Sequence, residues 1–181
     1  QVAPIAPGII SRAYLEDIRA NIQQLETSQG ANLQRAAMMI AQEAKAGRKT
    51  IVATQGHAPW RYVGQGDDAR WAVLSDLDHE VPAQVEAYKK TPQGALVLRL
   101  GYEGLHRDEA ALFAAKKQRV ILVTVPTPRP EFQPPAGLPL TIDMGWKYGD
   151  AVVPIAGYPI KILPPSGVMQ VVAYQSINVE V

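Results

Sequence analysis

The fold is decided by residues 95–124, which read ALVLRLGYEGLHRDEAALFAAKKQRVILVT. An apolar run at residues 95–100 ends at Gly101, a segment of helical periodicity covers residues 106–118, and a second apolar run covers residues 120–124. Continuous apolar runs of this length are typical of strands that are buried on both faces of a parallel sheet. The stretch therefore predicts a strand–helix–strand unit with a right-handed crossover.

The same alternation continues on both sides of this unit. Upstream, the pattern predicts strands at residues 50–54 and 71–74 and a helix at residues 82–90. Downstream, it predicts a strand at residues 140–143, a small antiparallel hairpin of residues 151–155 and 158–162, and a final helix from Gly167 to about Asn178, capped by Ser166. Strands that alternate with helices predict an α/β fold, a three-layer α-β-α sandwich around a central parallel sheet.

Residues 1–181 are predicted to form a single domain with two less regular parts. Residues 1–11 form an N-terminal extension, after which two amphipathic helices are expected, one from a Ser11 cap to a break at Gly30 and one from Leu33 to Gly47. Six prolines from Pro126 to Pro139 predict an extended connection without helix or central strand. Its length would suit a lid or an arm that reaches a partner.

The composition excludes several classes of protein. The charged fraction is 19% and the formal net charge is +1, so no strong field attracts nucleic acid or an anionic membrane. No apolar run approaches the roughly 20 residues that span a bilayer. The chain has no cysteine, so the redox compartment cannot be read from it. Because the sequence begins with Gln1 and not with Met, we expect either a cleaved signal peptide or a shortened sequence, with export slightly favoured.

Four segments carry a resemblance to a known family. They are Thr54-Gln55-Gly56-His57, Tyr148-Gly149-Asp150-Ala151, residues 155–161, and Pro165-Ser166-Gly167-Val168. In order and spacing they resemble SIS (sugar isomerase) phosphosugar-binding proteins, and most of all an uncharacterised SIS subgroup. The likeness runs over residues 12–181 and is most specific in the C-terminal third. It implies an SIS-like sheet of the flavodoxin or Rossmann type and a sugar-phosphate ligand.

The two loops that hold phosphate in SIS proteins depart from the family pattern. The resemblance implies Ser and Thr hydroxyls in both loops, next to backbone N–H groups at a helix N-terminus. The first loop has Ala58 where the relatives have Ser, and the second, residues 99–104, has lost its hydroxyl cluster and carries Glu103, which would repel phosphate. We therefore expect a sugar site with degenerate phosphate contacts.

Three histidines follow three predicted strands, and these positions share one edge of a parallel sheet. His57, His79 and His106 lie there together with carboxylates, so they could ligate a divalent ion or act as acid and base. Without an H-x-x-x-H spacing, no metal ligand and no cofactor is assigned. Alternatively, His106 begins a helix whose first turn carries Asp108 and Glu109. Arg99, unusual in an apolar strand, would pair with a carboxylate such as Asp76 or bind an anion.

Three functions remain open from the sequence. The first is a sugar or sugar-phosphate binding protein without catalysis, the second an aldose–ketose isomerase, and the third a structural dimer that has lost the site. The last helix is apolar on more than one face, which, as in SIS proteins, predicts a homodimer. The candidate catalytic residues are Glu103, His57 and His106. The candidate ligand-binding residues are Thr54, Gln55, Gly56, His57, Arg99, Gly101 and Ser166.

Overall fold

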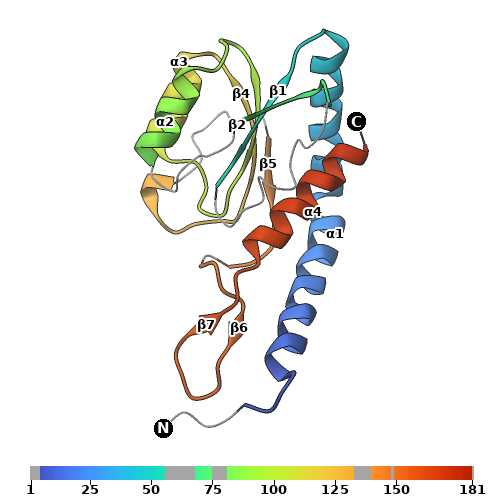
Figure 1. The fold of residues 1–181 in the computed structure, drawn as a ribbon, viewed down its shortest axis with the longest axis vertical. Coiled ribbons are helices and arrows are strands. Elements are labelled where there is room, and N and C mark those ends of the chain that lie inside the picture. The colour runs from blue at the N-terminus through green and yellow to red at the C-terminus, as the bar shows by residue number, and fades with distance from the viewer. Residues whose placement is uncertain (1–4, 56–67, 75–80, 133–139, 148, 181) are drawn as a thin grey trace.

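A five-stranded parallel sheet forms the centre of the protein (Figure 1). The computed structural model describes residues 5–55, 68–74, 81–132, 140–147 and 149–180, with the backbone alone at 81–84. The strand order is β2-β1-β3-β4-β5, and all neighbours run parallel. The strands are β1 (Thr50–Thr54), β2 (Trp71–Leu74), β3 (Leu96–Leu100), β4 (Arg119–Thr124) and β5 (Leu140–Asp143). The predicted central strands are thereby confirmed.

Helices cover both faces of this sheet, which confirms the three-layer sandwich (Figure 1). Helices α1 (Ile9–Lys45) and α4 (Ser166–Val179) lie on one face, and α2 (Val81–Lys89) and α3 (Arg107–Ala115) lie on the other. Alternate residues of each strand serve the two cores. In β3, Leu96, Leu98 and Leu100 belong to the α1–α4 side, and Val97 packs on the α2–α3 side. Helix α3 ends before the predicted Gln118, since Lys117 takes a positive φ of 52°.

The strand order locates the edge where ligands are expected. Order 2-1-3-4-5 is that of flavodoxin-like doubly wound sheets, in which the order reverses between β1 and β3. Ligands of such sheets bind outside the carboxyl ends of the strands, near that reversal. Thr54 and Leu100 are paired at these carboxyl ends, so the residues that follow them define the candidate site.

Helix α1 is continuous, so the predicted break at Gly30 is wrong. It runs for 37 residues from Ile9 to Lys45, with Gly8 as its N-cap. The helix therefore begins before the predicted cap Ser11, and the N-terminal extension is shorter than the predicted residues 1–11. Glycine in a helix interior costs about 1 kcal/mol relative to alanine, and here packing of the flanking residues Leu25 and Leu33 in the core overrides that cost. In the part of the chain that the structure describes, no helix is long and apolar enough to cross a membrane.

The C-terminal third holds a small hairpin and the last helix. Strands β6 (Val153–Pro154) and β7 (Lys161–Ile162) pair antiparallel, as predicted but over fewer residues. The proposed Ser166 cap is wrong, because Ser166 is the first residue of α4 and Pro165 holds the N-cap position without a side-chain cap. Contrary to the prediction of no helix, the described part of the Pro-rich connection holds a short turn of 3₁₀ helix, η2 (Pro130–Phe132), which a proline can begin because the first N–H groups of a helix have no partner within it.

Candidate functional site

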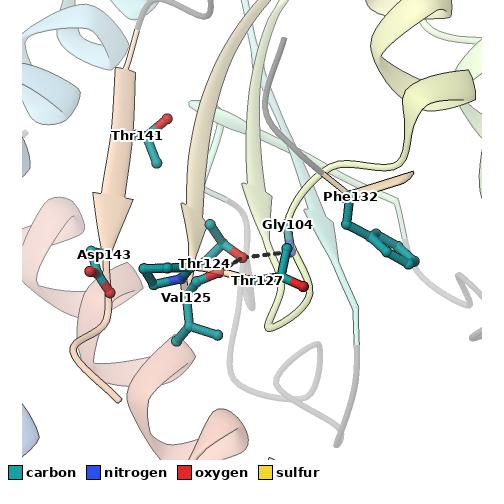
Figure 2. A pocket seen from close by; sticks show the side chains of 8 residues that line it. Gly104, Thr124, Val125, Thr127, Phe132, Thr141 and Asp143 are labelled. Carbon is teal, nitrogen blue, oxygen red and sulfur yellow. Dashed lines mark hydrogen bonds between the residues drawn. The ribbon is translucent and has the colours of Figure 1, made fainter. Parts of the chain in front are cut away.

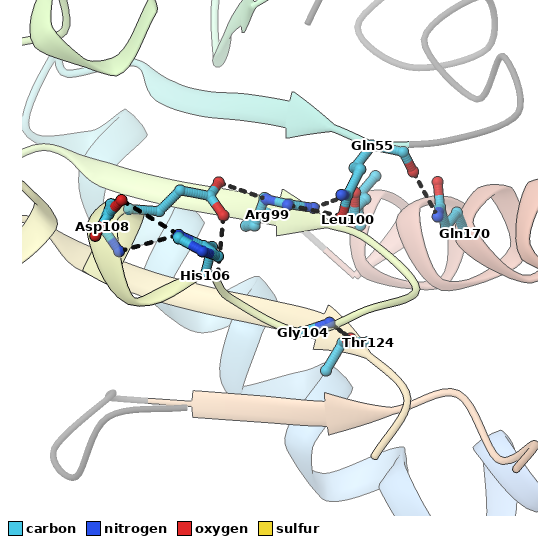
Figure 3. Close-up of polar contacts among 9 residues, drawn as sticks. Gln55, Arg99, Leu100, Gly104, His106, Asp108, Thr124 and Gln170 are labelled. Carbon is cyan, nitrogen blue, oxygen red and sulfur yellow. Dashed lines mark hydrogen bonds and ion pairs between the residues drawn. The ribbon is translucent and has the colours of Figure 1, made fainter. Parts of the chain in front are cut away.

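Arg99 is the centre of a buried polar network at the carboxyl end of β3 (Figure 3). It points towards α3, because its neighbours Leu98 and Leu100 face the opposite core. Its Nη2 donates to Gln55 Oε1 at 2.8 Å and its Nη1 donates to the Leu100 carbonyl at 3.1 Å. Its Nε lies 3.4 Å from Glu109 Oε1, and both side chains of this ion pair are fully buried. Glu109 is therefore a carboxylate partner of Arg99, and Asp76, which the sequence suggested as an example, lies outside the described residues.

The groups around Arg99 keep its buried guanidinium positively charged. Burial alone would lower the pKa of the Arg99 guanidinium, but the charge of Glu109 together with Tyr88 holds that pKa above its ordinary value. A buried charge of this kind is stable only when it is paired and hydrogen-bonded. Since the carboxylate of Glu109 neutralises it, Arg99 acts as a structural cation of the α3 side.

Gly101 is required by this network. An alanine Cβ at that position would lie 2.2 Å from Arg99 Nη1 and 3.0 Å from Gln55 Oε1. The first contact is impossible without a shift of the guanidinium, and the second is tighter than an ordinary van der Waals contact. Gly101, a candidate ligand-binding residue, thus makes room for the Arg99 guanidinium. This packing is sufficient to explain why the position is a glycine.

Gln55 connects the end of β1 to two other elements. Its side chain accepts from Arg99, its backbone N–H donates to the Leu100 carbonyl at 2.7 Å, and its own carbonyl accepts from Gln170 Nε2 of α4 at 3.0 Å. Gln55 is 3% exposed, and Thr54 before it is 5% exposed. The structure therefore brings Thr54, Gln55, Arg99 and Gly101 together, but as a closed network inside the sheet edge.

The two described catalytic candidates lie in the next loop, and both have structural contacts. His106 is the N-cap of α3: its Nδ1 accepts from the backbone N–H of Asp108, while the carboxylate of Glu109 accepts from the N–H of His106. The structure thus agrees with the alternative in which His106 begins a helix. Glu103 Oε1 lies 3.3 Å from Arg129 Nη1. The two side chains are thus committed to a cap and an ion pair.

Ser166 lies apart from the Arg99 network. Its hydroxyl donates to Asp150 Oδ2 at 2.7 Å, and its backbone N–H donates to Asp150 Oδ1 at 3.2 Å. A carboxylate that accepts from the first N–H of a helix both satisfies an orphan donor and complements the helix dipole. Asp150 therefore caps α4 from a distant turn, and Ser166 is buried beneath this contact.

Several predicted residues fall outside the described ranges. They are Gly56, His57, Ala58, Asp76 and His79. The three-histidine edge is therefore not tested by the structure. Among the described residues, no cluster of three or more His, Cys, Asp or Glu side chains could hold a metal ion.

A pocket of about 200 Å³ opens beside this network, at the carboxyl ends of β4 and β5 (Figure 2). Its walls come from four places in the chain: the β3–α3 loop, the residues after β4, η2 and β5. The lining residues are Gly104, Thr124, Val125, Pro126, Thr127, Phe132, Thr141 and Asp143. We call it the threonine pocket.

The loop before α3 is shaped to hold the wall of this pocket. Gly104 has φ +86°, and a Cβ there would lie 2.4 Å from the Phe132 carbonyl oxygen, so only glycine permits the approach. Its N–H donates to Thr124 Oγ1 at 2.7 Å. The Phe132 ring is held from behind by His106, edge-on at 5.4 Å, and by the Arg129 guanidinium at 4.8 Å. The predicted loop residues therefore support the pocket indirectly.

The polar groups of the pocket are mainly acceptors and hydroxyls. Asp143 is half-buried, and its Oδ1 accepts from the Gly145 N–H at 2.9 Å, which fixes the carboxylate. Thr127 Oγ1 accepts from the Arg129 N–H at 3.2 Å. A shallower depression of about 480 Å³ adjoins the pocket through Pro126, Thr127 and Asp143, and reaches Lys147. Together they form an open surface that is mainly apolar, with the Asp143 carboxylate, three threonines and Lys147 as its polar residues.

Sequence reasoning missed this pocket. Thr124 and Asp143 end their strands, so the rule that ligands bind at carboxyl ends would have included them had it been applied to every strand. Phe132 could not have been found in this way, since it reaches the pocket from the Pro-rich connection. No known family model and no curated protein matches the chain, so the resemblance to SIS proteins stays a prediction and the function must be argued from the site.

Proposed function

We propose that this protein binds a small, unphosphorylated, polyhydroxylated ligand, a sugar or sugar derivative, in the threonine pocket and does not catalyse its conversion. The observation that carries the proposal is the donor and acceptor set of that pocket. Three threonines and Asp143 line it, and none of its eight described lining residues is cationic. Such a set suits a ligand that offers hydroxyl groups and no negative charge.

The complementarity has two parts. A carboxylate accepts hydrogen bonds from ligand hydroxyls, and charge-assisted bonds of this type are the stronger ones. A threonine hydroxyl both donates and accepts, so the exposed Thr141 can pair with a ligand hydroxyl in either direction. The Thr124 hydroxyl is already used within the protein, since it accepts from the Gly104 N–H and donates to the Val125 carbonyl. Val125, Pro126 and Phe132 also line the pocket and add apolar surface for the C–H groups of a sugar. At about 200 Å³ the pocket is smaller than sites for drug-sized ligands, which favours a monosaccharide-sized occupant.

A phosphate group is disfavoured in the same place. The Asp143 carboxylate would repel it, and the positive charge of Arg99, buried near the end of β3, is already neutralised by Glu109. Lys147 borders the outer depression and is exposed, so its charge is screened by solvent. The degenerate loops inferred from the sequence point the same way, to a sugar without phosphate.

A thermal-shift panel tests the proposal against its alternatives. The panel contains free pentoses and hexoses, each beside its phosphate ester, and divalent metal salts. We expect a rise of the unfolding midpoint with at least one free sugar and a smaller rise with its phosphate. A larger rise with the phosphate would overturn the proposal, and so would no rise with any member, which would favour the structural-dimer alternative.

Proton exchange separates a binder from an isomerase. An aldose–ketose isomerase moves a proton between adjacent carbons and so exchanges it with solvent. The stabilising sugar is therefore incubated with the protein in deuterated water and analysed by NMR. We expect no deuterium at its C1 or C2 positions; incorporation would establish catalysis and contradict the proposal.

A further inference from the structure

Basic side chains gather at the amino edge of the sheet, opposite the edge that holds the threonine pocket. Here the carboxyl ends of α1, α2 and α3 meet the first residues of β1, β3 and β4 (Figure 1). In the described part of the chain, this edge comprises residues 43–49, 68–70, 86–95 and 114–119, and we call it the basic edge. It holds nine of the 18 Lys and Arg residues of the chain, and only three acidic residues are described there.

Contacts between the elements make the basic edge one continuous surface. Lys116 Nζ, after α3, donates to three backbone carbonyls at the end of α2, of which the Tyr88 carbonyl lies at 2.9 Å. Arg119, at the start of β4, and Arg48, after α1, both pair with the carboxylate of Glu43. Because Lys116 and Arg119 are three residues apart, the ends of the three helices form a single basic surface.

The three acidic side chains of the basic edge are all used within it. The ion pairs join Glu43 to Arg48 and Arg119, Asp68 to Arg70, and Glu86 to Lys89. Four further lysines, Lys45, Lys49, Lys90 and Lys117, are exposed and take part in none of these pairs. Nine positive charges against three negative ones leave an excess of six among the described residues of this edge.

The carboxyl ends of the helices account for only part of this excess. Each end carries about half an elementary negative charge, so three ends together are balanced by about one or two cations. Lys116 alone already binds the last carbonyls of α2. The formal net charge of +1 averages over the whole chain and does not describe this edge. An excess of about four positive charges is therefore available to an anionic partner.

The residues of the basic edge distinguish between kinds of anionic partner. Its described residues include no exposed large apolar side chain, and its aromatic residue Tyr88 is fully buried. Stable membrane anchoring adds apolar groups to a basic patch, and single-stranded nucleic acid stacks its bases on aromatic rings. Protein–protein interfaces are poor in lysine, whereas protein–DNA interfaces are polar and strongly positive. The basic edge therefore suits the phosphate backbone of a duplex best.

We propose that the basic edge binds double-stranded nucleic acid through its phosphate backbone, without reading the base sequence. Lys45 and Lys49 contribute from the end of α1, and Lys90 and Lys117 contribute from the ends of α2 and α3. Contacts to phosphate position a protein on a duplex but carry no sequence information. The inference does not depend on the ligand proposed above, since the threonine pocket lies at the other edge of the sheet.

Fluorescence anisotropy with a labelled DNA duplex of about 20 base pairs tests the partner. We expect a dissociation constant of about 1–100 μM at about 0.15 M salt, the same within about twofold for a second, unrelated sequence. The affinity should fall steeply as salt is added, because each phosphate contact releases counterions. No binding at about 50 mM salt would overturn the proposal. So would tighter binding to single-stranded DNA, to polyglutamate or to vesicles of phosphatidylserine and phosphatidylcholine.

A pair of neutral substitutions tests the surface. Lys49→Gln combined with Lys90→Gln removes two exposed charges that enter no ion pair of the basic edge. We expect the affinity for the duplex to fall about tenfold or more, and the slope of log affinity against log salt to become shallower by about two. The matched control is Arg12→Gln combined with Lys161→Gln, an equal change at exposed positions in the first turn of α1 and in β7. Unchanged binding in the first variant, or an equal loss in both, would overturn the proposal.

Discussion

Arg99 and Glu109 illustrate, at the scale of single residues, how a buried charge is made tolerable. Both side chains are fully buried, and the guanidinium also donates to Gln55 and to the Leu100 carbonyl. Removing one partner of a buried pair leaves an uncompensated charge, which costs far more than the pair contributes. The cost of a substitution therefore depends on whether both charges are removed.

Replacing Arg99 by methionine should be severely destabilising. Arg99→Met leaves Glu109 charged and buried, and we expect a loss of about 3–5 kcal/mol of unfolding free energy in urea denaturation. Arg99→Met combined with Glu109→Gln should cost clearly less than the sum of the two single variants. The control Arg107→Met, at an 80% exposed position, should lie within about 0.5 kcal/mol of the wild type. Equal effects at Arg99 and Arg107 would refute the network.

The Asp143 carboxylate is the residue on which ligand binding should depend most. Asp143→Asn keeps an acceptor for the Gly145 N–H but removes the charge that strengthens bonds to ligand hydroxyls. We expect the affinity for the stabilising sugar, measured by calorimetry, to fall about tenfold or more, since such bonds contribute about 1.5–3 kcal/mol. Glu16→Gln, an exposed change of equal charge on α1, should leave it unaltered. Unchanged binding in Asp143→Asn would place the ligand elsewhere.

At the scale of elements, the continuity of α1 makes a prediction about Gly30. Because an alanine Cβ there meets nothing, Gly30→Ala should raise the unfolding free energy by about 0.5–1 kcal/mol. The comparison with the wild-type chain is made by urea denaturation. If the chain instead turned at Gly30, as the sequence suggested, Gly30→Ala would leave the unfolding free energy unchanged or lower it.

The end of α1 is attached to β4 through Glu43, and this attachment should respond to acid. Glu43 is 2% exposed, with Arg48 Nε at 2.7 Å and Arg119 Nη2 at 2.5 Å. Hydrogen bonds from Arg48, opposed by burial and assisted by Arg119, lower the pKa of Glu43 from 4.5 to about 2. The folded pKa is the lower one, so the stabilisation is complete above about pH 4.5 and is lost as the pH falls towards 2.

The Glu43→Gln variant measures this contribution directly. It has no carboxyl group to titrate, so it should lose less unfolding free energy than the wild type between pH 5 and pH 2. Some acid sensitivity should persist, because the hydrogen bond from Arg70 also lowers the pKa of Asp68 to about 2. Identical pH profiles of the two proteins would contradict the role of Glu43.

At the scale of the whole molecule, the strands of the sheet were predictable from the sequence, and the buried polar network around Arg99 was not. The β-branched and leucine-rich runs of β1, β3 and β4 have one interpretation, because only a strand buried on both faces tolerates them. The helix break predicted at Gly30 was wrong because packing of α1 overrides the local preference of glycine for helix ends. The cap predicted at Ser166 was wrong because the distant carboxylate of Asp150 accepts from the start of α4 instead. The threonine pocket depends on chain segments that meet only in the fold.

The carboxyl edge of β4 and β5 carries the threonine pocket. The residues that the sequence proposed as catalytic support this edge: His106 caps α3 and packs on Phe132, and Glu103 pairs with Arg129, which covers the same ring. The central claim is therefore that the carboxyl edge binds a neutral sugar in the pocket these residues stabilise.

Backbone NMR with the sugar that stabilises the protein most tests this claim directly. The ¹⁵N-labelled protein is titrated first with the free sugar and then, in a second sample, with its phosphate ester. We predict saturable shifts of the amide signals of Gly104, Thr127 and Asp143 with the free sugar, at lower concentration than with the ester. Shifts confined to residues outside the threonine pocket, or tighter binding of the ester, would contradict the account.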